Sequence, residues 1–312
     1  MDVSVQSTSQ RWIYALKPMS WAKLAVPMIM GQGLGLWVGT DIAAWGIAYG
    51  LLYTVLDLVF IVLLNDWGDR HVDAIKREMF PDGCSPKTIP DGILPARSLL
   101  VGGLCAGVLA AAAGFAFESW VDRPFIAWVG LAGLVMFAAY TFGPLKLNYR
   151  GGGEFVEMLG VGAVLPWLNA YAVGGVIWAE SYGWVLAGST LMALSSALAS
   201  GLADEESDRA GGKRTFTTMF GNVTIRYWVD RLLAAGALVW LAMPFGYPDL
   251  GVAGGLAGLV AGYFWFRMRA VSDQAGTNAF AAQKVFKLML HRAIWWSSTI
   301  LGVALGVLGF LG

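Results

Sequence analysis

The chain has 312 residues, of which 57% are hydrophobic and 13% are charged. Soluble domains carry about 25% charged residues, so this composition excludes an ordinary soluble protein. The 21 basic side chains balance the 21 acidic ones, and this neutral net charge gives no indication of a nucleic-acid partner. The 41 glycines and 15 tryptophans are typical of helices packed closely in a lipid bilayer with aromatic residues at its interfaces.

Nine apolar stretches follow one another along the chain, and each is long enough to cross the hydrocarbon core of a membrane. They cover residues 22–40, 43–64, 97–117, 124–142, 155–176, 182–203, 229–246, 250–267 and 293–311. The sequence therefore predicts an all-α integral membrane protein, with nine transmembrane helices arranged around a central cavity.

Basic residues are distributed unevenly over the segments that connect these stretches. Of the 21 Lys and Arg residues, only Arg123 lies in the short connections after the first, third, fifth and seventh stretches. Cytoplasmic segments carry an excess of Lys and Arg. We therefore expect a multi-pass protein of the inner or plasma membrane, with its N-terminus inside and its C-terminus outside. The long connections around 66–96 and 204–228, with 143–153 and 268–292, are expected to form a cytoplasmic cap.

The second apolar stretch runs into NDWGDRHVD, residues 65–73. If the helix continues, Asn65, Asp69 and Asp73 lie four residues apart on one face, with Asp66 at its edge. Stacked carboxylates repel one another unless a cation lies against them. Mg²⁺ suits such a place, because it binds proteins through one or two carboxylates together with substrate phosphates. For this stretch alone, a solvated acidic helix end is the alternative.

A second acidic cluster follows the sixth apolar stretch, in the segment ADEESDRAGGKRT. Asp204 and Asp208 are again four residues apart on one face of a helix, at the same end of a span as the first cluster. Each cluster is followed by basic residues near a glycine-bearing turn, namely Lys87, Lys213 and Arg214. Two facing carboxylate clusters with cations above them predict a site for a diphosphate bridged by Mg²⁺. A substrate with a diphosphate head and a lipid-soluble tail is an isoprenyl diphosphate.

These motifs resemble those of the UbiA superfamily of intramembrane prenyltransferases. NDWGDRHVD is similar to the NDxxDxxxD motif of that superfamily, and DEESD is similar to its second motif, DxxxD. The stretches AYTFGPLKL, GGGEF and DRAGGKRT look most like the branch that prenylates 1,4-dihydroxy-2-naphthoate on the way to menaquinone. The resemblance implies one membrane domain over 1–312, with two pseudo-repeat halves at roughly 10–150 and 151–312.

The resemblance also implies an Mg²⁺-dependent transfer of an isoprenyl group from a prenyl diphosphate to an aromatic acceptor. Two Mg²⁺ ions would be held by Asn65, Asp69, Asp73, Asp204 and Asp208. Asp66 would bind metal or orient one of its ligands. The departing diphosphate would be neutralised by Lys87, Lys213 and Arg214. Tyr140 and Lys146 match family positions that line the cavity, where Tyr140 would shield the allylic cation and Lys146 would orient the diphosphate or the acceptor.

One departure from the naphthoate branch concerns Ser200 and Ala203. That branch usually has Asn at the first of these positions and Arg at the second, so this chain lacks an amide ligand and a cation there. We expect metal binding in the second cluster to depend more strongly on Asp204 and Asp208, and the acceptor to differ from naphthoate if the change affects its site.

Three further acids are candidates for a role in the cavity. Glu154 and Glu157 begin the fifth apolar stretch, where they either cap a helix or bind the acceptor. Asp57 lies two turns before Asn65, and an acid at that depth in a span is expected to face the protein interior.

The residues leave the reaction partner open. We favour 1,4-dihydroxy-2-naphthoate or a related quinone precursor. The alternatives are 4-hydroxybenzoate, a chlorophyllide, a specialised aromatic metabolite, and cyclisation of the prenyl diphosphate without any acceptor. A cation-coupled transporter is the non-enzyme alternative, because transporters also carry acids within the membrane. Acids gathered at one interface beside Lys and Arg suit a phosphate group better. The sequence gives no indication of the oligomeric state.

Overall fold

The computed structural model describes residues 6–311, and each of the nine predicted stretches is helical. The helices that make up the bundle are α2 (Ala22–Val38), α3 (Ala44–Met79), α4 (Ala96–Trp120), α5 (Ile126–Thr141), α6 (Gly153–Leu159), α7 (Leu165–Gly174), α8 (Glu180–Ser200), α11 (Asn222–Gly246), α12 (Gly251–Arg269) and α13 (Lys284–Leu311). A π-helical turn at Gly160–Val164 joins α6 to α7. The short helices are α1 (Thr8–Leu16), α9 (Glu205–Ala210) and α10 (Phe216–Phe220).

Within residues 6–311, seven helical segments are long and apolar enough to cross a membrane. They are Ala44–Met79, Ala96–Trp120, Gly153–Gly174, Glu180–Ala203, Asn222–Gly246, Pro248–Arg269 and Lys284–Leu311. The remaining two predicted spans correspond to α2 and α5, which are apolar but have only 17 and 16 residues. The structure therefore supports a multi-pass membrane protein with seven candidate spans.

Two helix starts and one connection differ from the prediction. Helix α11 begins at Asn222 and α13 at Lys284, before the expected starts at 229 and 293. Helix α3 continues to Met79, so the first part of the predicted 66–96 cap is helical. Helical hydrogen bonding does not end where apolar residues end, which is why hydropathy alone places these boundaries wrongly.

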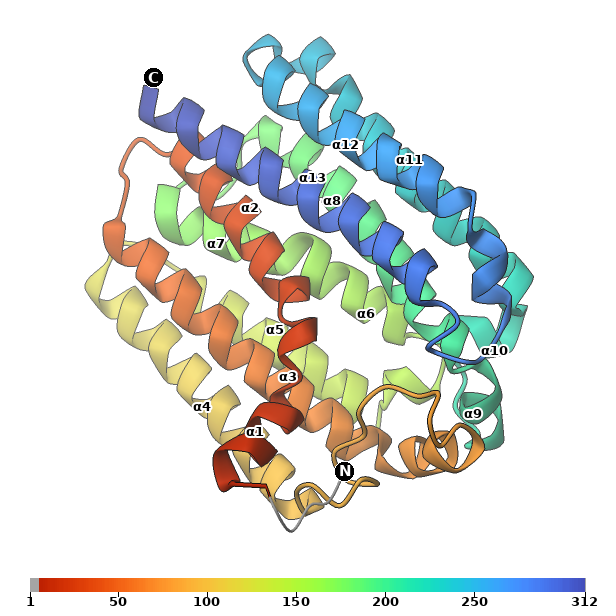
Figure 1. The fold of residues 1–312 in the computed structure, drawn as a ribbon. Coiled ribbons are helices and arrows are strands. Elements are labelled where there is room, and N and C mark those ends of the chain that lie inside the picture. Colours follow the sequence, from red (N-terminus) through yellow and green to blue (C-terminus); the bar gives the residue numbers. More distant parts are fainter. Residues whose placement is uncertain (1–5, 312) are drawn as a thin grey trace.

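Helix α2 lies near the middle of the bundle, between α13 and α7 (Figure 1). Its glycines allow both neighbours to approach closely, because a side chain would collide with their backbones. A Cβ atom at Gly33 would lie 1.8 Å from the carbonyl oxygen of Gly302 on α13, and one at Gly31 would lie 2.2 Å from that of Pro166 on α7. Small residues at helix contacts are a common means of packing helices in lipid.

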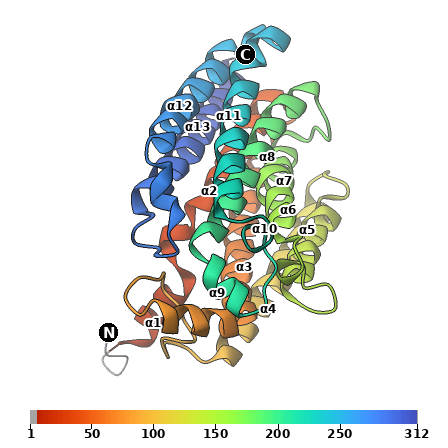
Figure 2. The same cartoon turned by 90° about the vertical axis from the view of Figure 1, so that its right-hand side faces the viewer.

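The connections after α3, α8 and α12 meet at one end of the bundle, where α1 and α9 also lie (Figures 1 and 2). Helix α9 contacts α3, and the 3₁₀ turn Gly201–Ala203 contacts the turn Ser272–Gly276. Both acidic motifs are thus at this end of the bundle. The predicted sides of the two termini concern residues 1–5 and 312, which lie outside the described residues.

Gly33→Ala is expected to lower the thermal stability of the protein in detergent, because its methyl group has no space against α13. Overpacking of this kind lowers the free energy of unfolding by about 1–3 kcal/mol. Gly262→Ala on α12 is the matched control, since a Cβ atom at Gly262 has no heavy atom within 4 Å. Its unfolding temperature should stay level or rise, because Ala favours a helix. Equal unfolding temperatures for the two variants would contradict the close contact between α2 and α13.

Candidate active site

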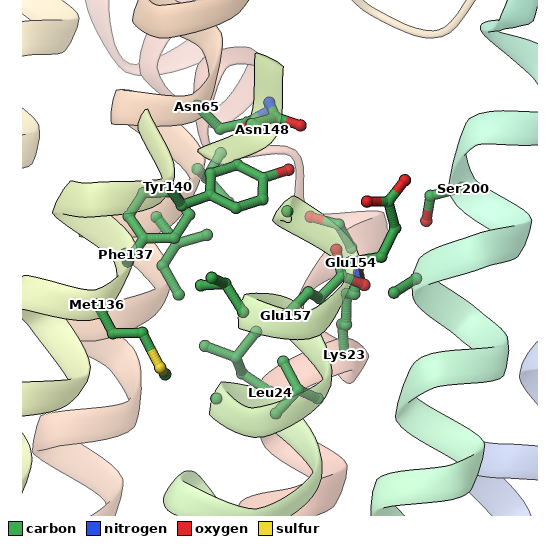
Figure 3. Close-up of a pocket in the computed structure, with 18 of the residues that line it drawn as sticks. Lys23, Leu24, Asn65, Met136, Phe137, Tyr140, Asn148, Glu154, Glu157 and Ser200 are labelled. Atoms are coloured by element: carbon green, nitrogen blue, oxygen red, sulfur yellow. Dashed lines mark ion pairs between the residues drawn. The ribbon is translucent and has the colours of Figure 1, made fainter. Parts of the chain in front are cut away.

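A cavity of about 360 Å³ brings together most of the predicted site residues. Those that line it are Asn65, Asp66, Asp69, Tyr140, Asp204, Asp208 and Lys213. Figure 3 shows Tyr140 and Ser200 on opposite sides of the cavity, with Met136 and Phe137 along one wall. The π-helical turn Gly160–Val164 forms part of the lining, and such turns are frequent at functional sites. The cavity thus combines a polar region with a long apolar region.

The first acidic cluster lies on the continuous helix α3, as predicted. Asp69 accepts a hydrogen bond from the Lys213 ammonium at 2.9 Å. Asp66 accepts one from the Thr88 hydroxyl at 2.7 Å and is also paired with Lys17. Each carboxylate is therefore held by a group from a distant part of the chain. Asn65 lines the same cavity from the same helix.

Asp73 and Lys87 pair with each other but do not line the cavity. The Lys87 loop is held by Asp91, whose carboxylate accepts hydrogen bonds from the Lys87 amide at 2.9 Å, from Tyr14 at 2.6 Å and from Arg77 at 2.7 Å. Burial raises the pKa of Asp91, but these hydrogen bonds outweigh it and the pKa is lowered. Asp91 was not predicted, although its position in KTIPDG, at the turn after Lys87, was the available signal.

The second acidic cluster does not lie on one continuous helix, which corrects the prediction. Helix α8 ends at Ser200, and a 3₁₀ turn precedes Asp204, whose φ and ψ of −113° and 3° place it outside α9. The Asp208 amide nevertheless donates to the Asp204 carbonyl at 2.8 Å. Both side chains line the cavity.

Asp208 is buried, and none of the described Lys and Arg side chains forms an ion pair with it. Burial is the main reason that the pKa of its carboxyl is raised to about 7, while Lys213 opposes the rise and Asp204 adds to it. A nearby cation would favour the ionised form of this carboxyl.

Four lysines neutralise the remaining motif carboxylates. The pairs are Lys17 with Asp66, Lys76 with Asp204, Lys87 with Asp73, and Lys213 with Asp69. Buried charges are costly unless they are paired, so these ion pairs allow the carboxylates to remain together. Lys17 and Lys76 were not predicted. No sequence spacing links either of them to its partner.

The segment after α5 contributes a residue that the sequence reasoning missed. The Asn148 amide lies 3.3 Å from both carboxylate oxygens of Asp69 and lines the cavity. Lys146 does not line the cavity, because its ammonium lies 3.7 Å from the centre of the Tyr149 ring. Arg214 is exposed and also lies outside the lining; its backbone amide donates to Tyr149 at 3.3 Å.

Polar residues also lie on the wall formed by α2 and α6. The Lys23 ammonium is 2.6 Å from a carboxylate oxygen of Glu157, an ion pair drawn in Figure 3. Glu154 accepts a hydrogen bond from the Phe216 amide at 2.7 Å, so it joins α6 to α10. Both acids line the cavity, as does Asp57 deeper along α3. Phe137 and Tyr140 stack with ring centres 5.2 Å apart and form an aromatic surface.

Among residues 6–311, no three Asp, Glu, His or Cys side chains are close enough together to form a complete metal site. The arrangement fits Mg²⁺ rather than a metal held by a full protein cage. Carboxylate and amide oxygens face one cavity from two sides, and Mg²⁺ normally completes its coordination with phosphate oxygens and water.

Comparisons with known proteins agree with this arrangement. Residues 24–291 match the UbiA prenyltransferase family. Chlorophyll synthase of Arabidopsis thaliana is 27% identical over 241 residues, which are 73% of this chain and 60% of that protein. The chain thus spans less than two thirds of the length of that relative. 1,4-Dihydroxy-2-naphthoate octaprenyltransferase of Escherichia coli (strain K12) is 26% identical over 252 residues, which are 76% of this chain and 77% of that protein.

Solved structures show the same fold. A UbiA homolog from Archaeoglobus fulgidus bound to DMAPP and Mg²⁺ has a TM-score of 0.68 and 15% identity, covering 94% of this chain and 99% of that one. The structure of a UbiA homolog from the same organism bound to GPP and Mg²⁺ has a TM-score of 0.67 at 15% identity and covers 93% of this chain and 99% of that one. With its two acidic motifs on one cavity and a family match over most of its length, this chain belongs to the UbiA prenyltransferase family.

Proposed function

We propose that the protein transfers an isoprenyl group from a prenyl diphosphate to an aromatic acceptor in an Mg²⁺-dependent reaction. One observation carries the proposal: carboxylates from two distant motifs face a single cavity that is polar at one end and apolar along its walls. A diphosphate group suits the polar end, and a hydrocarbon tail suits the apolar walls. The family match and the relatives named above support this class of reaction.

The donor diphosphate would lie between the two acidic clusters. Bound Mg²⁺ would stabilise negative charge on the leaving group. The residues expected to hold a pair of ions are Asn65, Asp69, Asp204 and Asp208, together with Asp73, which pairs with Lys87 outside the cavity lining in this structure. Asp66, held by Lys17 and Thr88, would orient the first cluster.

Two of the lysines that pair with motif carboxylates, Lys213 and Lys87, are candidates to neutralise the negative charge of the diphosphate. Lys213 lies between the two clusters, beside Asp69 and near Asp208. When the diphosphate enters, its oxygens would compete with Asp69 for the Lys213 ammonium. Lys87, paired with Asp73 outside the cavity lining, would add positive charge from its loop near the first cluster. These cations stabilise the charge that develops as the bond to the diphosphate breaks.

The transfer breaks the bond between the allylic carbon and the diphosphate oxygen, and the electron pair leaves with the diphosphate. A ring carbon of the acceptor forms the new bond to the allylic carbon and then loses its proton. Tyr140 and Phe137 present an aromatic surface beside this region, which would stabilise the cationic carbon by up to about 2 kcal/mol. Water is kept from the cation by the apolar lining.

The preferred acceptor is 1,4-dihydroxy-2-naphthoate or a related quinone precursor. The Lys23–Glu157 pair supports an acceptor with both an acidic and a hydroxyl group, because it offers a cation and a carboxylate on one wall of the cavity. A chlorophyllide is the second candidate, since the similarity to chlorophyll synthase is as high as that to the naphthoate enzyme.

For the membrane arrangement, we propose nine crossings, with α2 and α5 as short spans beside the seven long ones. The end that carries both acidic motifs would face the cytoplasm and be capped by the connections there. The excess of basic residues in those connections supports this orientation.

The test uses purified protein in nanodiscs with geranylgeranyl diphosphate, with and without Mg²⁺. The acceptors are 1,4-dihydroxy-2-naphthoate, 4-hydroxybenzoate, a chlorophyllide and none, and mass spectrometry identifies the products. We expect a prenylated adduct that requires Mg²⁺ and forms with one class of acceptor. A hydrocarbon formed without acceptor would instead indicate a cyclase. If the folded protein consumes no prenyl diphosphate of any length, the proposed function is wrong.

Asp69→Asn and Asp208→Asn are each expected to lower turnover at least about 100-fold, because loss of a metal ligand removes several kcal/mol of charge stabilisation. Asp249→Asn is the control, since Asp249 is an exposed acid outside the cavity. Steady-state rates at saturating donor give the comparison. Activity of both site variants near that of the control would show that the cavity carboxylates do not bind metal.

The positions of two lysines predict unequal effects of the same substitution. Lys213→Met should lower kcat about 100-fold, as loss of a charge-stabilising donor does in other enzymes. Lys146→Met should change kcat less than about threefold, because Lys146 lies over the Tyr149 ring outside the cavity. A large loss in Lys146→Met would show that this side chain moves into the site during turnover.

A further inference from the structure

Lys76 differs from the other three lysines that pair with motif carboxylates. Its side chain is 2% exposed, whereas those of Lys17, Lys87 and Lys213 are 23%, 12% and 9% exposed. It does not line the cavity. A bound diphosphate would therefore not reach its ammonium, and its role must be exerted through its neighbours.

The Lys76 ammonium connects three segments that are far apart in the chain. It donates hydrogen bonds to the carbonyl of Ala203 and, at 2.9 Å, to that of Asn278. It also lies 3.5 Å from a carboxylate oxygen of Asp204 and 4.4 Å from the centre of the Phe80 ring. The side chain thus fixes the residue that leads into the second acidic cluster.

The segment around Asn278 holds the second cluster from its other side. The Asn278 side chain accepts a hydrogen bond from the Glu206 amide at 3.1 Å and donates one to the Glu206 carboxylate at 3.0 Å. The side-chain amide of Asn222 donates a hydrogen bond to the carbonyl of Ala275 at 2.8 Å. Through Lys76, this network is tied to α3, the helix that carries Asp69.

We propose that Lys76 is a positioning residue that sets the second carboxylate cluster opposite the first. This inference rests on the proposed function. Because Lys76 and Asp69 share one rigid helix, the hydrogen bond to the Ala203 carbonyl fixes Asp204 relative to the first cluster. Lys76 also brings a positive charge to Ala203, the position at which the naphthoate branch usually has Arg and this chain lacks a cation.

Two effects of Lys76 on Mg²⁺ binding oppose each other. Its charge beside Asp204 repels a second cation, so removal of the charge alone would strengthen Mg²⁺ binding. Its hydrogen bonds hold Asp204 in place, so removal of the donors would weaken Mg²⁺ binding and leave the buried Ala203 carbonyl without this partner. The geometry favours the second effect, because the ammonium contacts both carbonyls more closely than the carboxylate.

The test compares Lys76→Met, which removes the charge and the donors, with Lys76→Gln, which removes the charge but keeps an amide donor. Lys284→Met is the control, because Lys284 is exposed. One readout is the rise in unfolding temperature on titration with Mg²⁺ in the presence of inorganic pyrophosphate. The other is the Mg²⁺ concentration that gives half-maximal turnover.

Lys76→Met is expected to need about tenfold more Mg²⁺ in both readouts, since loss of a group that orients a metal ligand weakens binding by roughly this factor. Lys76→Gln should need less than Lys76→Met, and the control should match the unmodified protein. Unchanged or tighter Mg²⁺ binding in Lys76→Met would overturn the proposal, as would equal shifts in the two variants.

If Lys76→Met does not fold, Lys76→Gln alone decides. An Mg²⁺ requirement at or below that of the unmodified protein supports the hydrogen-bonding role of Lys76, and a tenfold higher requirement overturns it. No Mg²⁺ response in the unmodified protein would instead count against the proposed function.

Discussion

Acidic side chains placed together in an apolar protein repel one another unless positive charge balances them. In this protein the balance comes from lysines that reach the carboxylates from other segments. Lys17 extends from the chain before α2, and Lys213 from the turn after α9. These ion pairs join α3 to segments from other parts of the chain, so the cavity depends on them for its shape as well as for its charge.

The bundle supplies the surroundings that this charge pairing requires. Close contact of α2 with α13 and α7, made possible by glycines such as Gly33, brings α2 into the middle of the molecule. The π-helical turn Gly160–Val164 and the aromatic pair Phe137 and Tyr140 then line an apolar space below the acidic end. A polar head and a hydrocarbon tail can therefore occupy one continuous cavity.

Much of this could be predicted from periodicity and spacing. The positions of the nine apolar helices follow from hydropathy, and the common face of Asn65, Asp69 and Asp73 follows from helical geometry. The second cluster was predicted to lie on one helix, but the chain turns between Ser200 and Glu205. A local propensity pattern does not reveal such a turn, because the Lys76 ammonium of α3 and contacts with α10 hold it.

The sequence by itself determined the class of protein, the helical stretches and the two acidic motifs, because composition and periodicity are local properties. Only the tertiary structure decided which cation meets which carboxylate. Lys17 and Asp66 are 49 positions apart, Lys213 and Asp69 are 144 apart, and Lys76 lies 127 positions from Ala203. No sequence period links groups at these separations. Packing of the helices brings them together, and it also places Lys146 and Arg214 outside the cavity although they lie close to its residues in the chain.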